Sequence, residues 1–163
     1  MSLRALTADD VDRLKAVSGR ECADCSLCCK LAAIPEIDKP ANKWCRHCKP
    51  GDGCLIYLTR PDTCAAFACD WLTDLHVPDF WRPVKSHMVL TRVMSRGQIV
   101  LRVMVDSNYS DAWKDEPYRS HLVQLAQKGF LERRFVVHVL VGRRAWAVQP
   151  NGEFQALSDN YTE

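Results

Sequence analysis

The chain has 163 residues, of which 47% are apolar and 26% charged, and 22 basic residues against 20 acidic ones leave a net charge of +2. A chain of this length and composition can bury a core of its own, which excludes a largely disordered protein. A charge so near neutrality lacks the strong positive field of a dedicated duplex-DNA binder, so a nucleic-acid partner is not expected. No window approaches eighteen uninterrupted apolar residues, and no membrane span is expected either.

The first segment, residues 1–19, is predicted to be a helix that ends at Ser18-Gly19, because apolar residues recur in it near helical spacing. Acidic residues occupy the positions where a signal peptide would need its apolar core: Asp9, Asp10 and Asp12. We therefore expect a cytoplasmic protein.

The second segment, residues 20–72, holds all nine cysteines of the chain and shows neither helical nor strand periodicity. Gly, Pro, Asp and Lys are interleaved with the thiols, so the segment cannot pack a core of its own. In a reducing cytosol such a cluster indicates metal ligation or redox chemistry rather than a disulfide framework. We expect metal bonds to supply the free energy that orders this module.

The third segment, residues 73–163, begins with a proline-punctuated linker and is then predicted to be a small α+β region. Two hairpins flank a helix that starts at Asp115-Glu116-Pro117 and stops at Gly129. The expected strands cover residues 87–94, 98–105, 135–141, 145–149 and, as a last short strand, 154–157. The fold class is therefore α+β: an irregular, metal-stapled cysteine-rich module packed as one compact unit against a small antiparallel sheet with one or two helices.

The cysteine spacing permits two kinds of metal centre. Cys22-x2-Cys25 and Cys45-x2-Cys48 are nineteen residues apart, which fits a four-cysteine zinc site. Cys22, Cys25 and Cys28 also match the opening of a bacterial ferredoxin motif, but Cys29 follows at once where that motif needs three other residues. Adjacent cysteines rarely chelate one tetrahedral ion without strain, so Cys28 and Cys29 serve two sites or one of them is a buried thiol.

The same residues resemble a known family. The run C-x2-C-x2-C-C, followed by Gly53-Cys54-Leu55-Ile56-Tyr57 and by Arg60-Pro61-x2-Cys64-x2-Phe67-x-Cys69, is similar to the bacterial CxxCxxCC family of YkgJ-type, zinc- or iron-chelating proteins. The resemblance covers residues 22–71, under a third of the chain, and implies a metal centre more firmly than any activity. It implies eight ligands and leaves Cys48 as an extra thiol; the complete candidate set is Cys22, Cys25, Cys28, Cys29, Cys45, Cys48, Cys54, Cys64 and Cys69.

The leading hypothesis is a cytoplasmic protein that chelates one or two zinc ions, with the cluster in a structural or scaffolding role. The alternative is an iron–sulfur protein that acts in electron transfer or as an oxidoreductase, although the chain carries no dinucleotide-binding fingerprint for a second cofactor. Whether the protein is an enzyme, and what protein partner or small-molecule substrate the sheet region contacts, stays open.

Two further expectations concern the end of the cysteine-rich module. We expect Tyr57, Phe67, Trp71 and Trp81 to form a small aromatic core between the module and the sheet. Arg60 either stabilises the thiolates or pairs with Asp62 or Asp70, or it simply belongs to a turn.

Overall fold

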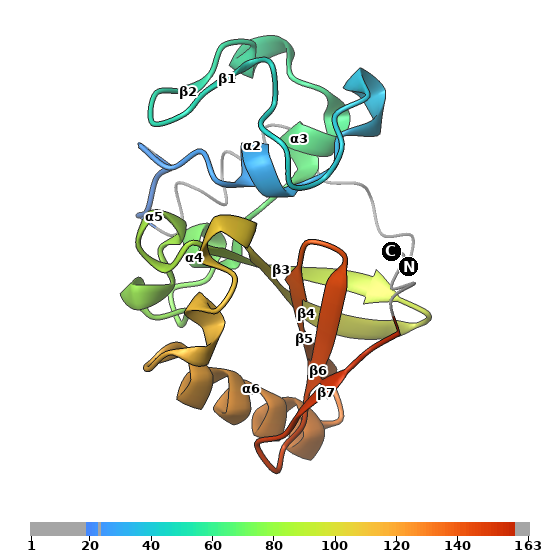
Figure 1. Ribbon diagram of the computed structural model, residues 1–163. Coiled ribbons are helices and arrows are strands. Elements are labelled where there is room, and N and C mark those ends of the chain that lie inside the picture. The colour runs from blue at the N-terminus through green and yellow to red at the C-terminus, as the bar shows by residue number, and fades with distance from the viewer. Residues whose placement is uncertain (1–18, 23, 159–163) are drawn as a thin grey trace.

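The computed structural model describes residues 19–22 and 24–158, so the helix expected over residues 1–19 lies almost wholly outside the described residues. The main element is a five-stranded sheet in the order β3-β4-β5-β6-β7 (Figure 1). Its strands are β3 (Met88–Ser95), β4 (Gln98–Val105), β5 (Phe135–Val141), β6 (Arg144–Val148) and β7 (Phe154–Ala156). Together with its helices, the sheet confirms the α+β class.

The sheet is mixed, and the expectation of a purely antiparallel sheet was wrong at one pair. β4 and β5 run parallel, with Ile99 opposite Phe135 and Val105 opposite Val141, while the other three pairs are antiparallel. The helix α6 (Tyr118–Glu132) connects these two strands and returns the chain to the level where β4 began. Two neighbouring parallel strands need such a crossover connection. The residue pattern of an individual strand does not reveal which strand it pairs with or in which direction.

Helix α6 also continues past the predicted stop at Gly129. It ends at Glu132, where Arg133 adopts the left-handed conformation with φ 51° and its N–H bonds back to the carbonyls of Gly129 and Phe130. Gly129 has a packing role instead, because a Cβ at this position would lie 2.3 Å from the carbonyl oxygen of Phe135. The glycine thus lets α6 approach the start of β5 closely.

The first hairpin agrees with the sequence pattern. Its two-residue turn, Arg96-Gly97, has positive φ angles of 50° and 80°, which match the twist of the flanking strands. The second hairpin turns at Gly142, and its return strand begins at Arg144, one residue earlier than expected.

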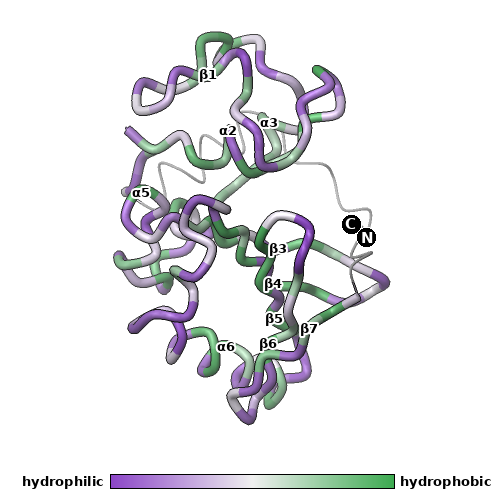
Figure 2. The backbone as a smooth tube through the Cα atoms, viewed as in Figure 1, coloured by the Kyte–Doolittle hydropathy of each residue, from purple (hydrophilic) through white to green (hydrophobic). Residues whose placement is uncertain are grey.

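The two faces of the sheet carry different layers. One face packs against α6 through a large core that includes Leu90, Leu101, Val103, Val137 and Val139. The other face contributes Val89 and Met104 to a second, smaller core with Leu27 and Leu31 of the cysteine-rich module. In Figure 1 the module lies above the sheet and α6 lies on the opposite side, and Figure 2 shows long hydrophobic runs in β3 and β4 between these layers.

The cysteine-rich module consists of short elements joined by turns, as its lack of periodicity predicts. Its helices are α2 (Cys28–Leu31), α3 (Asp62–Ala66) and α4 (Asp70–Thr73), its 3-10 turns cover Pro35–Ile37 and Tyr57–Thr59, and its hairpin pairs β1 (Cys48–Lys49) with β2 (Gly53–Cys54). After the module come the 3-10 turn Asp79–Trp81 and helix α5 (Pro83–Ser86), and two more 3-10 turns, Ser107–Tyr109 and Ala112–Lys114, precede α6.

Polar contacts reinforce the junction between module and sheet. Lys30 of α2 donates to Asp106, the residue after β4, over 2.6 Å, and both side chains are at least nine-tenths buried. Arg20 donates to the carbonyl oxygens of Trp71 and Val77, at 2.5 and 2.9 Å. A buried ion pair requires close fit between its partners, so the module contacts the sheet in one defined orientation.

The expected aromatic core forms only in part. Trp71 and Trp81 are buried in the large core, and Phe67 packs against the smaller one. Tyr57, in contrast, does not join the aromatic core. Its side chain is 43% exposed, and the Arg60 guanidinium lies 3.9 Å from the centre of its ring. None of the helices in the described part of the chain combines the length and the apolar composition that crossing a bilayer requires.

Candidate metal centre

The β1–β2 hairpin and helix α2 bring cysteines from distant parts of the module together. Cys48 and Cys54 are directly opposite each other in the hairpin. The backbone N–H of Cys45 donates to the carbonyl oxygen of Cys29 over 3.0 Å, which fixes the segment before β1 against α2. Ser26 accepts a hydrogen bond from the N–H of Gly51 at the tip of the hairpin, at 3.1 Å.

Six thiols form what we call the outer group: Cys28, Cys29, Cys45, Cys48, Cys54 and Cys64. The Cys28 thiol raises the pKa of Cys29 and the Cys48 thiol lowers it, while the pKa of Cys48 is raised mainly by burial and lowered by the Ser26 hydroxyl, so these four side chains lie close to one another. Cys64 of α3 interacts electrostatically with Cys29, Cys45 and Cys54. The N–H of His47 donates to the Cys45 sulfur at 3.4 Å, a contact that stabilises a thiolate.

A buried lysine accompanies the outer group. Lys39 is only 6% exposed and its ammonium donates to the carbonyl oxygens of Lys30 and Ala32 at the end of α2, the first at 2.8 Å. Its charge lowers the pKa of Cys29, although the Cys28 hydrogen bond and burial raise that pKa much more. Lys39 therefore both caps α2 and places a positive charge where thiolates would need one.

The other three thiols, Cys22, Cys25 and Cys69, form what we call the inner group. Cys25 and Cys69 pack against the smaller core. Burial raises the pKa of both thiols, and a charge on Cys22 raises the pKa of Cys25 further, as a charge on Cys25 does for Cys69. The backbone N–H groups of Leu72 and Trp71 act to lower the pKa of Cys69, and that of Leu27 acts to lower the pKa of Cys25, although burial outweighs both effects. The inner group thus lies where the module meets the sheet, whereas Cys22 is exposed.

Burial is the largest cause of a raised pKa at four of the thiols. It raises the pKa of Cys48 and of Cys69 to about 12 and that of Cys64 to about 11, and it raises the pKa of Cys25 as well. A thiol must lose its proton to bind a metal, so metal binding here would release protons and would depend steeply on pH.

This arrangement differs from the simplest spacing argument. Cys25 interacts with Cys22, and Cys48 interacts with Cys45 and Cys29, so we assign the two C-x2-C pairs to different groups. Within residues 19–22 and 24–158, no three Cys, His, Asp or Glu side chains are arranged closely enough to share a metal ion. None of the nine cysteines, all of which lie in the described residues, forms a disulfide.

The donor chemistry of the outer group fits zinc. Six soft sulfur donors, two more than a closed tetrahedral zinc site uses, lie around α2 and the hairpin. Thiolate sulfur is equally the donor that iron–sulfur clusters require. The residues present therefore suit a thiolate-bound metal, and their identity alone does not choose between the two.

Sequence reasoning missed the polar residues that support the thiols. Ser26 and Lys39 belong to no recognisable motif, and only the fold brings them to Cys48 and Cys29. Asp70 pairs with Arg92 of β3 at 3.3 Å rather than with Arg60, which stacks on Tyr57. No local signal could have indicated the role of Lys39, because it lies eight residues beyond the end of α2 and reaches the carbonyl of Lys30 only through the fold.

The comparisons with known proteins add no relative. No family model matches the chain, and no curated protein and no solved structure is significantly similar to it. What is established is therefore the class alone: an α+β protein with a separate cluster of free thiols on one face of its sheet.

Proposed function

We propose that the outer group binds zinc and that the protein is a metal-binding protein in which the cysteine-rich module has a structural or scaffolding role. The observation that carries this proposal is that six thiols, from α2, the segment before the hairpin, the hairpin itself and α3, lie in one part of the module and act on one another's charge. Four thiolates complete a closed tetrahedral zinc site, which has no open position for a substrate.

The small size of the module's own core also supports a structural metal. The smaller core contains four buried residues, Leu27, Leu31, Val89 and Met104, and two of these come from the sheet. So little apolar burial does not offset the entropy of ordering some fifty residues, whereas structural zinc contributes on the order of 10 kcal/mol or more to folding. The resemblance to the CxxCxxCC family agrees with this proposal.

The zinc chemistry would rest on particular residues. Zinc bound to thiolates is redox-inert and supplies bonds that hold segments together. Lys39 would offset part of the negative charge that four thiolates bring, and the N–H of His47 would hold the Cys45 sulfur in place. A cytoplasmic location would keep the thiols reduced.

The test is elemental analysis, with an absorption spectrum, of protein purified without oxygen and without added metal. We expect at least about one zinc per chain and no visible absorption. The double variant Cys29→Ser/Cys48→Ser should lose about one zinc equivalent, while Cys22→Ser, which removes an exposed thiol of the inner group, should keep the zinc of the outer group.

Two results would overturn the proposal. Less than about half an equivalent of any transition metal in protein that is folded by circular dichroism would show that the cluster does not need a metal. Iron with sulfide, and a broad band near roughly 400 nm, would replace zinc by an iron–sulfur cluster and the scaffolding role by electron transfer.

A further inference from the structure

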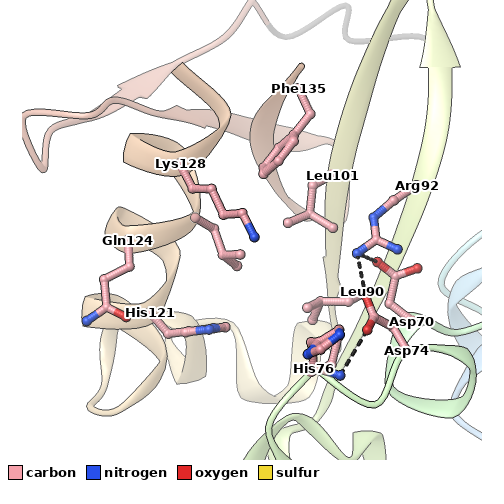
Figure 3. A pocket seen from close by; sticks show the side chains of 12 residues that line it. Asp70, Asp74, His76, Leu90, Arg92, Leu101, His121, Gln124, Lys128 and Phe135 are labelled. Atoms are coloured by element: carbon pink, nitrogen blue, oxygen red, sulfur yellow. Dashed lines mark hydrogen bonds and ion pairs between the residues drawn. The ribbon is translucent and has the colours of Figure 1, made fainter. Parts of the chain in front are cut away.

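The sheet region contains a cavity that the metal chemistry does not use. It has a volume of about 270 Å³ and lies between α4, strands β3 and β4, and helix α6, on the face of the sheet that packs against α6. Figure 3 shows its side chains arranged as two polar walls on either side of an apolar floor. Ligand pockets in proteins usually span about 300–1,000 Å³, so this cavity suits a molecule at the small end of that range.

The floor of the pocket is apolar and comes from four elements. Leu90 and Leu101 belong to neighbouring strands, Leu125 to α6, and Phe135 to the start of β5. An aliphatic group that covers this floor would gain about 25 cal/mol for each Å² of apolar surface removed from water. The floor thus selects for an aliphatic portion in the ligand.

One wall carries an excess of negative charge. Asp70 and Asp74 lie next to Arg92, whose guanidinium is 3.3 Å from the first carboxylate and 3.0 Å from the second. Asp70 is only 5% exposed, and its Oδ2, which is inaccessible to solvent, is the atom that faces Arg92 at 3.3 Å. Asp74 is 25% exposed, so its carboxylate is the one that a ligand can reach, and two carboxylates with one guanidinium leave a net charge of about −1 on this wall.

The opposite wall, on α6, presents donors. The ammonium of Lys128 extends into the cavity (Figure 3). His121 accepts a hydrogen bond at Nδ1 from the indole N–H of Trp81, at 2.7 Å, so its neutral ring carries the proton on Nε2. Burial lowers the pKa of His121, which keeps the ring neutral near pH 7. Both side chains can therefore donate to an anionic group.

We propose that this pocket binds a small α-amino acid with an aliphatic side chain, the ammonium group at Asp74, the carboxylate at Lys128 and His121, and the side chain on the leucine floor. The two walls match the two charges of the zwitterion, and the apolar floor matches its side chain. A divalent cation does not fit, because Arg92 already lies between the two carboxylates.

The experiment uses the full-length protein with whatever metal it retains on purification. Glycine, L-alanine, L-valine, L-leucine and L-methionine are titrated separately while the ¹H–¹⁵N resonance of the Trp81 indole is followed, because this N–H bonds to the ligand-facing His121. The resonance is assigned with Trp81→Phe. We expect a saturable shift with at least one of the larger four and a smaller effect with glycine, which lacks a side chain for the floor.

Matched ligands and variants then test each wall. The N-acetyl derivative of the best ligand lacks the ammonium and its decarboxylated amine lacks the carboxylate, and each should bind at least tenfold more weakly. Asp74→Asn and Lys128→Gln should weaken binding at least tenfold, whereas Lys114→Gln, an exposed lysine paired with Asp111, should leave it unchanged.

The proposal is overturned if none of the five amino acids shifts the Trp81 indole at about 10 mM, which corresponds to an affinity too weak for a built site. It is equally overturned if the N-acetyl derivative or the amine binds as well as the amino acid, or if Lys128→Gln has no effect. None of these outcomes depends on zinc, so the pocket and the metal centre succeed or fail separately.

Discussion

Single residues at special positions govern how α6 meets the sheet. Gly129 contacts the backbone of β5 from within the helix, where glycine is otherwise unfavourable by roughly 1 kcal/mol relative to alanine. His121, one turn after the start of α6, accepts the hydrogen bond of the fully buried Trp81. Both residues would be unremarkable on an isolated helix, and both matter because of what lies opposite them.

Gly129→Ala should therefore destabilise the protein, although alanine favours helix. The new methyl carbon would lie 2.3 Å from a backbone oxygen that cannot rotate away, and overpacking of this kind costs about 1–3 kcal/mol. Urea unfolding measures the change. Ser120→Ala, at an exposed position of the same helix, is the control and should be neutral or slightly stabilising; equal stability of the two variants would contradict the close approach.

His121 should make the protein less stable in mild acid. Its pKa is lowered in the folded state by burial, so its contribution is present above the unfolded value of about 6.5 and is lost as pH falls through the folded value. In that window the unfolded chain binds the extra proton, and the free energy of unfolding should drop by up to about 1.4 kcal/mol per pH unit. Protonation also removes the acceptor for Trp81.

Unfolding curves between pH 5 and pH 8 measure this slope. His121→Gln should flatten it, while His76→Gln, at an exposed position, should not. An unchanged slope in the His121 variant would assign the acid sensitivity to other groups.

At the scale of elements, the contact between α2 and the end of β4 determines how the cysteine-rich module is oriented. The ion pair between Lys30 and Asp106 is buried on both sides, and Asp106 also accepts from the N–H of Asn108 at 3.0 Å. Lys30 follows Cys28 and Cys29 directly, so this pair links the outer group to the sheet through one turn of helix. Apolar contacts of Leu27 and Leu31 with Val89 and Met104 flank it.

Lys30→Met should cost about 3–5 kcal/mol, because it leaves the Asp106 carboxylate buried without its cation. Adding Asp106→Asn should recover a large part of this loss, since the amide oxygen still accepts from Asn108 while no charge remains buried. The measurement is a double-mutant cycle in urea.

The exposed pair of Lys49 with Asp52 provides the matched control for that cycle. Its side chains are 68% and 60% exposed, so Lys49→Met should change stability by at most about 1 kcal/mol. If Lys30→Met cost no more than Lys49→Met, the buried pair would not contribute to the junction.

At the scale of the whole molecule, apolar burial is distributed unevenly. The sheet and α6 share the large core, with Trp81, Leu90, Leu122 and Val103 among its fully buried members. The cysteine-rich module contributes few buried residues and exposes Leu55 and Leu58 to solvent. The sheet region thus has the means to stay folded when the module does not.

Removal of the proposed zinc with a chelator should therefore unfold the module selectively. We expect amide hydrogen exchange to become fast in residues 24–66 and to stay slow in β3, β4, β5 and α6, because local stability follows buried contacts. Mass spectrometry of the exchanged protein measures this by segment. Equal protection from exchange with and without metal, or loss of protection throughout the sheet when the metal is removed, would contradict the expectation that only the module unfolds.

Much of the sheet region could be predicted because its signals are local. Alternating apolar residues and the Arg96-Gly97 turn are sufficient for the first hairpin, and the strands 98–105 and 135–141 match β4 and β5 residue for residue. The prediction that the helix ends at Gly129 was wrong. Glycine can either end a helix or allow close packing within one, and only the contact with Phe135 shows that close packing is its role here.

The candidate site was predictable in composition and not in grouping. The density of thiols and the absence of periodicity in residues 20–72 come from the sequence alone, and so does the α+β class of the chain. Only the tertiary structure decided which thiols interact and that Lys39 and Ser26 approach them. It also decided where the pocket forms, between Asp70 and Asp74 on one side and His121 and Lys128 on the other. The reason is physical: periodicity and turn chemistry act between near neighbours in the chain, whereas charges and sulfurs tens of residues apart meet only after the elements that carry them have packed.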